Sequence, residues 1–183
     1  MDATLEAMVR ELHDRQAIRD VVNRYSRGID RQDRDILLSC YHADAIDDHG
    51  MFVGPAGEFF AWTDPSHLHL FRTHQHIVAN HTCELDGNMA HCETYYIFAG
   101  MTKDGNQLAM SGGRYIDRME KRSGKWKIAA RKCLVEWGSE NMSIDAMADV
   151  YAAVGKVARD QSDCSYDRPL TIDLARLGIR MGI

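Results

Sequence analysis

The sequence lacks a long apolar run and an excess of positive charge. No stretch approaches the length that crosses a bilayer, and Met1 to Arg15 is a charged, helix-like segment without the basic-then-apolar order of a signal peptide. The formal net charge is -5 with acids and bases interspersed, so no basic stripe is present to neutralise nucleic-acid phosphates. These absences predict a cytoplasmic protein whose partners include neither membrane nor nucleic acid.

The sequence also lacks the cysteine spacing of a disulfide framework or a zinc ribbon. Its five cysteines are widely scattered, and none belongs to a C-x-x-C pair: Cys40, Cys83, Cys92, Cys133 and Cys164. Reduced thiols in a core or an interface fit this pattern better, so we expect no cysteine chemistry and no bound metal. What the 183 residues do allow is one domain with a proper core.

Helical periodicity dominates the first 70 residues. A first amphipathic helix is indicated by apolar residues at helical spacing, namely Ile18, Val21, Val22, Tyr25 and Ile29. A second, short helix is expected over Arg34 to Tyr41. Residues 43–53 have the pattern of a strand closed by a turn at Gly54-Pro55, and Glu58 to Leu70 indicates a helix interrupted at Pro65.

Hairpin turns separate four long strands in the next part of the chain. The turns are Asp86-Gly87, Asp104-Gly105 and Ser123-Gly124, each between runs rich in β-branched or aromatic residues. The expected strands cover 73–85, 89–101, 107–121 and 125–137. Helices followed by antiparallel strands predict an α+β fold, in which a curved, cone-shaped sheet packs against the N-terminal helices. The interior of such a cone suits a small apolar cyclic or aromatic molecule.

The character of the chain changes after Glu140. Apolar residues return at helical spacing and are followed by a polar stretch and an apolar end over Leu170 to Ile183; the helical positions are Ile144, Met147, Ala148, Tyr151 and Val154. We therefore expect one domain over 1–140 and a C-terminal helical extension over 141–183. Its apolar stripes need cover, so it acts either as a lid over the pocket or as a contact in a homo-oligomer, a dimer or trimer.

One predicted strand is unusually rich in histidine. In the segment RTHQHIVANH, residues 72–81, strict alternation places His74, His76 and Asn80 on one face of the strand and His81 on the other. A lone strand histidine is more often solvated or held by a carbonyl than catalytic, but the grouping favours a site.

Tyr25 and Asp30 end the first predicted helix. On an unbroken helix five residues separate two side chains by about 140°, so we expect Gly28 to loosen the last turn and let Asp30 swing towards the pocket that Tyr25 faces. Asp30 would then accept a hydrogen bond from an imidazole. The simpler interpretation makes Tyr25 a core aromatic and Asp30 a cap of the next helix.

Several segments in this order resemble a known family. They are RQAIRDVVNRYSRGID over 15–30, YHADAID over 41–47, HIVAN over 76–80 and GKWKI over 124–128. Together they resemble the SnoaL-like branch of the nuclear transport factor 2-like superfamily, over about residues 10–140. Within that branch the sequence is similar to cofactor-independent lyases: hexachlorocyclohexane dehydrochlorinase, bile-acid 7α-dehydratase and, more distantly, scytalone dehydratase.

The resemblance implies a set of site residues. Asp30 and His76 match the aspartate and histidine of the general-base dyad, and Tyr25 matches a pocket tyrosine of the bile-acid enzyme. His74 and Arg131 match positions at or near pocket residues of the family, and the resemblance implies that both bind substrate. The implied enzyme is a lyase of the dehydratase type that uses no cofactor.

The chemistry of elimination accounts for these residue types. A neutral histidine, with an ordinary pKa near ~6.5, can take a proton at neutral pH, which suits His76 as the base. A carboxylate on the other ring nitrogen fixes the tautomer and stabilises the imidazolium, which is the role expected of Asp30. Tyr25 can donate a hydrogen bond to a leaving hydroxyl, and Asn80 and His49 are candidates for positioning the substrate.

Three alternatives stay open at this point. The same base could cleave a carbon-carbon bond with release of an aldehyde, or move a proton as an isomerase. The cone could also be a non-catalytic binding or assembly module. A metal enzyme could be built on His67-x-His69 and His74-x-His76, although that segment offers no carboxylate as third ligand and the first pair is expected in a helix.

Overall fold

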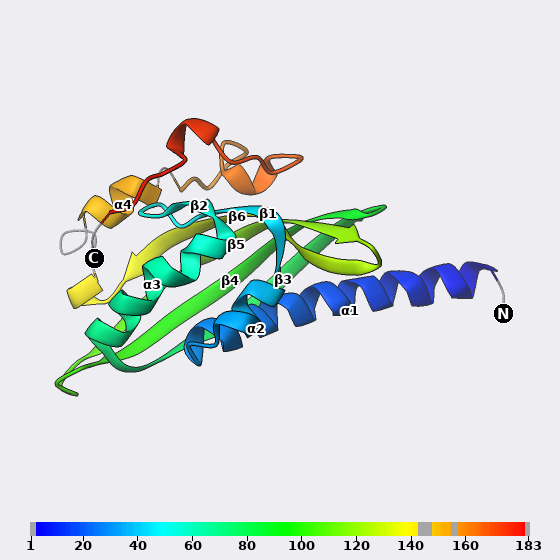
Figure 1. Ribbon diagram of the computed structural model, residues 1–183. Helices are drawn as coiled ribbons and strands as arrows, with labels where there is room; N and C mark the ends of the chain where they lie inside the picture. The colour runs from blue at the N-terminus through cyan, green and yellow to red at the C-terminus, as the bar shows by residue number, and fades with distance from the viewer. Residues whose placement is uncertain (1–2, 143–147, 155–156, 182–183) are drawn as a thin grey trace.

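The computed structural model describes residues 3–142, 148–154 and 157–181, and its described part is the predicted α+β fold (Figure 1). A six-stranded sheet has the order β2-β1-β6-β5-β4-β3. Every neighbouring pair is antiparallel except β1 and β6, which run parallel. Among the described helices, none combines the length and apolar character needed to cross a bilayer.

The four long strands confirm the hairpin prediction closely. They are β3 (Phe71–Asp86), β4 (Met89–Thr102), β5 (Leu108–Arg122) and β6 (Lys125–Gly138). The β5-β6 hairpin shows why the turn residues were informative. Ser123 and Gly124 both have positive φ, 50° and 76°, which is the backbone of the tight turn that matches the twist of antiparallel strands.

Several details of the N-terminal half differ from the sequence prediction. The single strand expected over 43–53 is two strands, β1 (Tyr41–Asp48) and β2 (Val53–Pro55), so Gly54-Pro55 lies in a strand and not in a turn. The chain reverses at Gly50 instead, where φ is 73° and the Asp48 carboxylate accepts the Gly50 N–H at 2.9 Å.

The helices also differ in their limits. α1 (Ala3–Asp30) continues to Asp30 without loosening at Gly28, and α2 (Arg34–Ser39) is shorter than expected. α3 (Ala56–Leu70) was predicted to break at Pro65 but runs through it, because a proline inside a helix removes a single N–H donor and the rest of the helix is retained.

The main core lies between α1 and the concave face of the sheet. The apolar residues that indicated the first helix from its periodicity are all buried there: Ile18, Val21, Val22, Tyr25 and Ile29. They pack with residues from β1, β4, β5 and β6, including Tyr41, Cys92, Tyr115 and Ile128. Burial of this apolar stripe fixes the helix over the sheet.

Much of the C-terminal segment packs on the other face of the sheet (Figure 1), whereas its Met142 and Val150 reach the cavity on the concave side. It contains η1 (Glu140–Met142), α4 (Ala148–Val154), η2 (Cys164–Tyr166) and η3 (Leu174–Arg176). Apolar contacts join it to β5 and β6 through Ile116, Leu134, Val154 and Leu170. The first part of the predicted tail helix, with Ile144 and Met147, lies outside the described residues. The role of 141–183 as a lid or an oligomer contact stays a prediction.

Candidate active site

A cavity of about 400 Å³ opens between the helices and the concave face of the sheet. Its wall is mainly apolar and aromatic, with contributions from Ile29, Met51, Phe59, Trp62, Leu70, Phe71, Tyr96, Phe98, Tyr115, Cys133 and Val135. Met142 and Val150 of the C-terminal segment also line it. Polar groups on the wall include Tyr25, His49, His67 and His76. The size and the few polar groups are typical of a site for a small organic molecule.

Asp30 and His76 form a close pair at the cavity wall. Nδ1 of His76 lies 2.7 Å from Oδ1 of Asp30, and the backbone N–H of His76 donates to both carboxylate oxygens, at 3.0 and 2.9 Å. Partial burial acts to raise the pKa of Asp30, but the hydrogen bonds from His76 outweigh it and the pKa lies below its ordinary value. Asp30 is therefore an anion that holds the Nδ1–H tautomer of His76 and leaves Nε2 as the basic nitrogen.

The pairing does not need the loosened helix end that the sequence suggested. Tyr25 and Asp30 lie on different sides of an unbroken α1, with Tyr25 packed against Tyr115 of β5 and Asp30 bonded to β3. Gly28 serves another purpose. A Cβ on Gly28 would stand 2.7 Å from the backbone nitrogen of Leu37, so glycine allows α2 to pack directly on α1.

His74 lies behind the pair and is not among the residues described as lining the cavity. Its Nε2 is 3.4 Å from the Ile29 carbonyl oxygen and 3.7 Å from Oδ1 of Asp30. Burial, and then the neighbouring His76, lower the pKa of His74, so its ring is neutral. His74 packs against Asp30 and His76 from outside the described lining, and its contact with substrate stays a prediction.

Asn80 is exposed and is also not among the described lining residues. The reason is a bulge in β3. Val78 pairs with Tyr96 whereas His81 pairs with Thr94, so β3 has one more residue than β4 between these points. The alternation reverses there, which turns Asn80 outwards and His81 inwards. The strand face predicted for Asn80 is wrong for this reason, and its substrate contact stays untested.

His49 lines the cavity, as expected, but it has a carboxylate partner of its own. Its Nδ1 faces Oδ1 of Asp47, its ring stacks on Phe59 with centroids 4.3 Å apart, and its Nε2 lies 3.4 Å from the Tyr25 hydroxyl. Burial acts to lower the pKa of His49, but the Asp47 charge and hydrogen bond raise it to about 10. His49 is thus an imidazolium at neutral pH.

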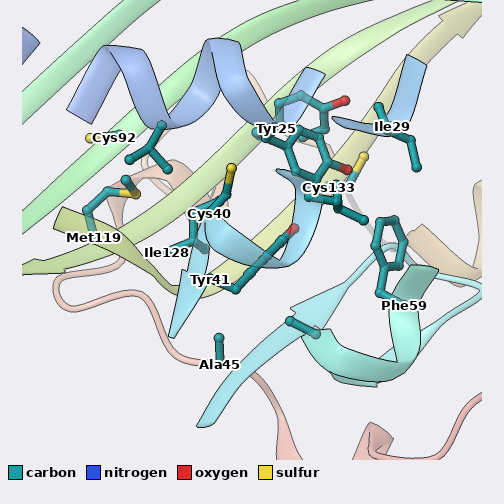
Figure 2. Close-up of a cluster of buried hydrophobic side chains, with 14 of the residues drawn as sticks. Tyr25, Ile29, Cys40, Tyr41, Ala45, Phe59, Cys92, Met119, Ile128 and Cys133 are labelled. Carbon is teal, nitrogen blue, oxygen red and sulfur yellow. The ribbon is translucent and has the colours of Figure 1, made fainter. Parts of the chain in front are cut away.

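Tyr25 lies between this imidazolium and the rest of the cavity. Burial raises the pKa of Tyr25 well above its ordinary value, so the phenol keeps its proton. Tyr41 donates to Oδ2 of Asp47 at 2.5 Å and completes a chain of polar groups from Tyr41 through Asp47 and His49 to Tyr25. The aromatic residues of this wall come from α1, β1 and α3 (Figure 2).

Arg131 is fully buried and is not among the described lining residues. Its guanidinium donates to both oxygens of Asp117 at 2.7 Å and lies 4.0 Å and 4.2 Å from the ring centres of Tyr25 and Tyr115. The guanidinium is thus occupied by protein partners, and the substrate contact predicted for Arg131 stays untested. The residue supports the two tyrosine rings from behind the cavity wall.

Sequence reasoning missed two polar groups of the site. Asp47 was not singled out, although Asp47 and His49 alternate at the end of a strand and so share a face. His67 was considered only as a metal ligand with His69, which is exposed. Burial, followed by the nearby His76 and His74, lowers the pKa of His67 to about 3, and its Nδ1 is buried without a partner among the described residues. A neutral imidazole therefore faces the cavity.

The sequence-based objection to a metal site is also wrong in one respect. Asp30 arrives from α1, so a carboxylate does stand beside the strand histidines, and ligand atoms of Asp30, His74 and His76 lie within 4.8 Å of one another. These atoms also have protein partners: the dyad bond engages Nδ1 of His76, and Nε2 of His74 is near a carbonyl.

A curved open sheet packed against N-terminal helices, with a partly buried polar pair at a cavity wall, is the architecture of the nuclear transport factor 2-like superfamily. The chain belongs to the SnoaL-like domain family, whose model matches residues 10–132. The resemblance noted in the sequence is thereby confirmed. The match ends before the C-terminal segment, and comparison with curated proteins gives no significant match.

Solved structures share the fold at low sequence identity. A hexachlorocyclohexane dehydrochlorinase from Novosphingobium barchaimii is 19% identical over 72% of this chain and 92% of that chain, with a TM-score of 0.64. A candidate scytalone dehydratase from Novosphingobium aromaticivorans is 17% identical over 71% and 89%, with a TM-score of 0.64. A Mycobacterium tuberculosis protein of unknown function is 22% identical over 84% and 89%, with a TM-score of 0.63.

Proposed function

We propose that the protein is a cofactor-independent lyase that removes water from a cyclic or aromatic small molecule. The observation that carries this proposal is the 2.7 Å contact between His76 Nδ1 and Asp30 at the wall of an apolar cavity. In this proposal Nε2 of His76 takes a proton from a carbon next to an electron-withdrawing group. Asp30 stabilises the imidazolium that forms.

The leaving hydroxyl departs from the neighbouring carbon with a proton. The C–H electron pair becomes the new double bond, the C–O bond breaks, and the Tyr25 phenol supplies the proton that converts the leaving group to water. His49 then returns a proton to Tyr25, since its imidazolium lies 3.4 Å from that hydroxyl and stays charged at neutral pH. His76 releases its proton to solvent, which also recharges His49, so the cycle consumes only the substrate.

The shape of the wall supports a planar, apolar substrate class. Phe59, Trp62 and Phe98 offer ring faces, and the described lining residues include no carboxylate and no lysine or arginine. A cationic substrate would find no carboxylate among them, and the charge of the His49 imidazolium is already paired with Asp47. The related dehydrochlorinase and the candidate dehydratase, named for eliminations, are consistent with this chemistry.

Deuterium exchange tests the base without knowledge of the exact substrate. The wild type, His76→Gln and Asp30→Asn would be incubated in heavy water with a panel of cyclic and aromatic β-hydroxy ketones, and mass spectrometry would follow water loss and exchange at the acidic carbon. We expect both variants to lose about 10²- to 10⁴-fold in rate. His42→Gln is the matched control, because its ring bonds the Glu120 carbonyl outside the cavity.

The other possible results of this experiment would each favour a different function for the site. Binding of panel members with neither exchange nor water loss would favour the binding module. Exchange without water loss would favour an isomerase, and release of an aldehyde would favour carbon-carbon cleavage. A stoichiometric metal bound through Asp30, His74 and His76 would replace the dyad with a metal site.

A further inference from the structure

We propose that His81, Cys83 and Cys92 form a zinc-binding site, separate from the cavity, that fastens the far end of β3 to β4. Ligand atoms of these three residues lie within 4.8 Å of one another. In a tetrahedral zinc site, bonds of about 2.0 to 2.3 Å place neighbouring ligand atoms about 3.3 to 3.8 Å apart. Small side-chain rotations would therefore bring the three groups onto one ion.

The register of the two strands creates this cluster. Cys83 and Cys92 are direct partners across β3 and β4, and His81 pairs with Thr94 two residues along. Alternate residues share a face of the sheet, so both cysteines and the histidine point to the same side. The bulge after Val78 is what turns His81 and Cys83 inwards, and Cys92 lies beneath α1 (Figure 2).

The histidine is held as a metal ligand would be. Its Nδ1 lies 2.8 Å from Oγ1 of Thr94, and the Nδ1–H tautomer donates to that oxygen. The lone pair is then on Nε2, which is buried without a hydrogen-bond partner among the described residues. A hydrogen bond that orients one ring nitrogen while the other binds metal is the usual arrangement around zinc.

Ligand softness and charge favour zinc. Two thiolates and an imidazole select thiophilic cations. A divalent ion with two thiolates is neutral overall, which suits a site where Cys92 is fully buried and His81 and Cys83 are partly buried. The guanidinium of Arg15, which donates to the Cys83 carbonyl, adds positive charge beside the cysteines. Three protein ligands leave the fourth position of a tetrahedral zinc ion to a water molecule.

The cluster is distinct from the proposed catalytic site. None of its three residues is among the described residues that line the cavity, and the bulge separates it along β3 from His76. β3 is an edge strand, so a metal that joins it to β4 would hold an end of the sheet that has a neighbour on one side only. The role we assign is therefore structural.

Cobalt(II) is the probe, because its thiolate complexes absorb in the near ultraviolet and visible regions. The reduced, metal-free full-length protein would be titrated with Co²⁺ and then with Zn²⁺. We expect one equivalent of Co²⁺ to give thiolate charge-transfer bands that Zn²⁺ abolishes, and the thermal midpoint to rise with zinc. Asp30→Asn should leave the bands intact, which excludes the cluster at the dyad.

Variants locate the ligands. Cys83→Ser and Cys92→Ala should abolish the bands, whereas Cys40→Ala, a fully buried cysteine elsewhere in the core, should keep them. Thr94→Val should weaken binding about 10- to 100-fold with the bands retained. Cys83 is only partly buried, so Cys83→Ser decides the matter if Cys92→Ala does not fold. The proposal would be overturned if the reduced wild type gave no bands or if the bands survived Cys83→Ser. It would also be overturned if Cys83 and Cys92 formed a disulfide and the reduced protein bound neither ion.

Discussion

The Tyr25 hydroxyl lies 3.4 Å from Nε2 of His49, whose other ring nitrogen faces the Asp47 carboxylate. The cavity therefore has a histidine paired with a carboxylate on each of two walls. His76 meets Asp30 through Nδ1, whereas the Asp47 charge keeps a proton on His49 at neutral pH. In the proposed elimination the first pair supplies the base and the second recharges the acid.

His49 should make folding stability fall as the pH rises. Its folded pKa, about 10, lies above the value of about 6.5 expected in the unfolded chain, so its contribution is complete below pH 6.5 and is lost between pH 6.5 and 10. Urea unfolding at several pH values should show the free energy of unfolding falling between pH 6.5 and 10, with a contribution from His49 of at most about 1.4 kcal/mol per pH unit. The variant His49→Gln should lack this contribution. An unchanged slope in that variant, with His42→Gln as control, would contradict the assignment.

Tyr25→Phe should separate proton donation from substrate binding. The variant keeps the ring that stacks on Arg131 but has no phenolic proton, so we expect turnover to fall about 10²- to 10³-fold with little change in ligand affinity. Tyr96→Phe is the matched control, because its hydroxyl donates to the Leu134 carbonyl at 3.3 Å. Equal rates for the two variants would remove Tyr25 from the mechanism.

Asp163→Asn should destabilise the contact between the C-terminal segment and the sheet. Both Asp163 oxygens accept from the buried Arg114 at 3.0 and 2.9 Å. Burial acts to raise the pKa of Asp163, but the bonds from Arg114 lower it, so the contribution is present above the ordinary carboxyl pKa and is lost in acid.

Arg114 keeps its bonds to Glu93 and Glu136, so its charge is not left unpaired, and we expect denaturant unfolding to show a loss of about 1 to 3 kcal/mol. The exposed Asp160→Asn is the control and should have almost no effect. A similar loss in both variants would mean that the ion pair is not the cause.

Gly28→Ala should be destabilising although alanine favours helices. The new Cβ would stand 2.7 Å from the Leu37 backbone nitrogen, so α2 must move, at a cost of about 1 to 3 kcal/mol. Gly57→Ala in the first turn of α3 is the matched control, since a Cβ there meets no atom within 4 Å. That variant should be neutral or slightly stabilised, and thermal unfolding of both would compare them.

The strands were predictable because the residues of the turns between them are recognisable from the local sequence. Asp-Gly and Ser-Gly pairs between apolar runs specify reversals without any tertiary information. The reversal at Gly50 was missed because its signal, an aspartate two residues before a glycine, is weaker than the Gly54-Pro55 pair that follows. Pro65 was expected to interrupt the third helix, but α3 continues through it to Leu70.

The site was less predictable because its contacts are non-local. Asp30 and His76 are 46 residues apart, so periodicity could not pair them, and the pairing was expected only from a family resemblance. The β3 bulge at Ala79-Asn80 has no glycine or proline to announce it, which explains the error at Asn80. Arg131 was misplaced because its partner Asp117 belongs to the neighbouring strand.

The bulge after Val78 divides β3 into two segments of opposite phase. Without a bulge, strict alternation of the full strand would keep His76 at the cavity but turn His81 and Cys83 to the solvent side. Deletion of Ala79, by contrast, would remove the bulge and leave all three facing inwards. The one extra residue therefore lets this edge strand present a second imidazole and thiol set to the interior, in the part of the strand beyond the cavity.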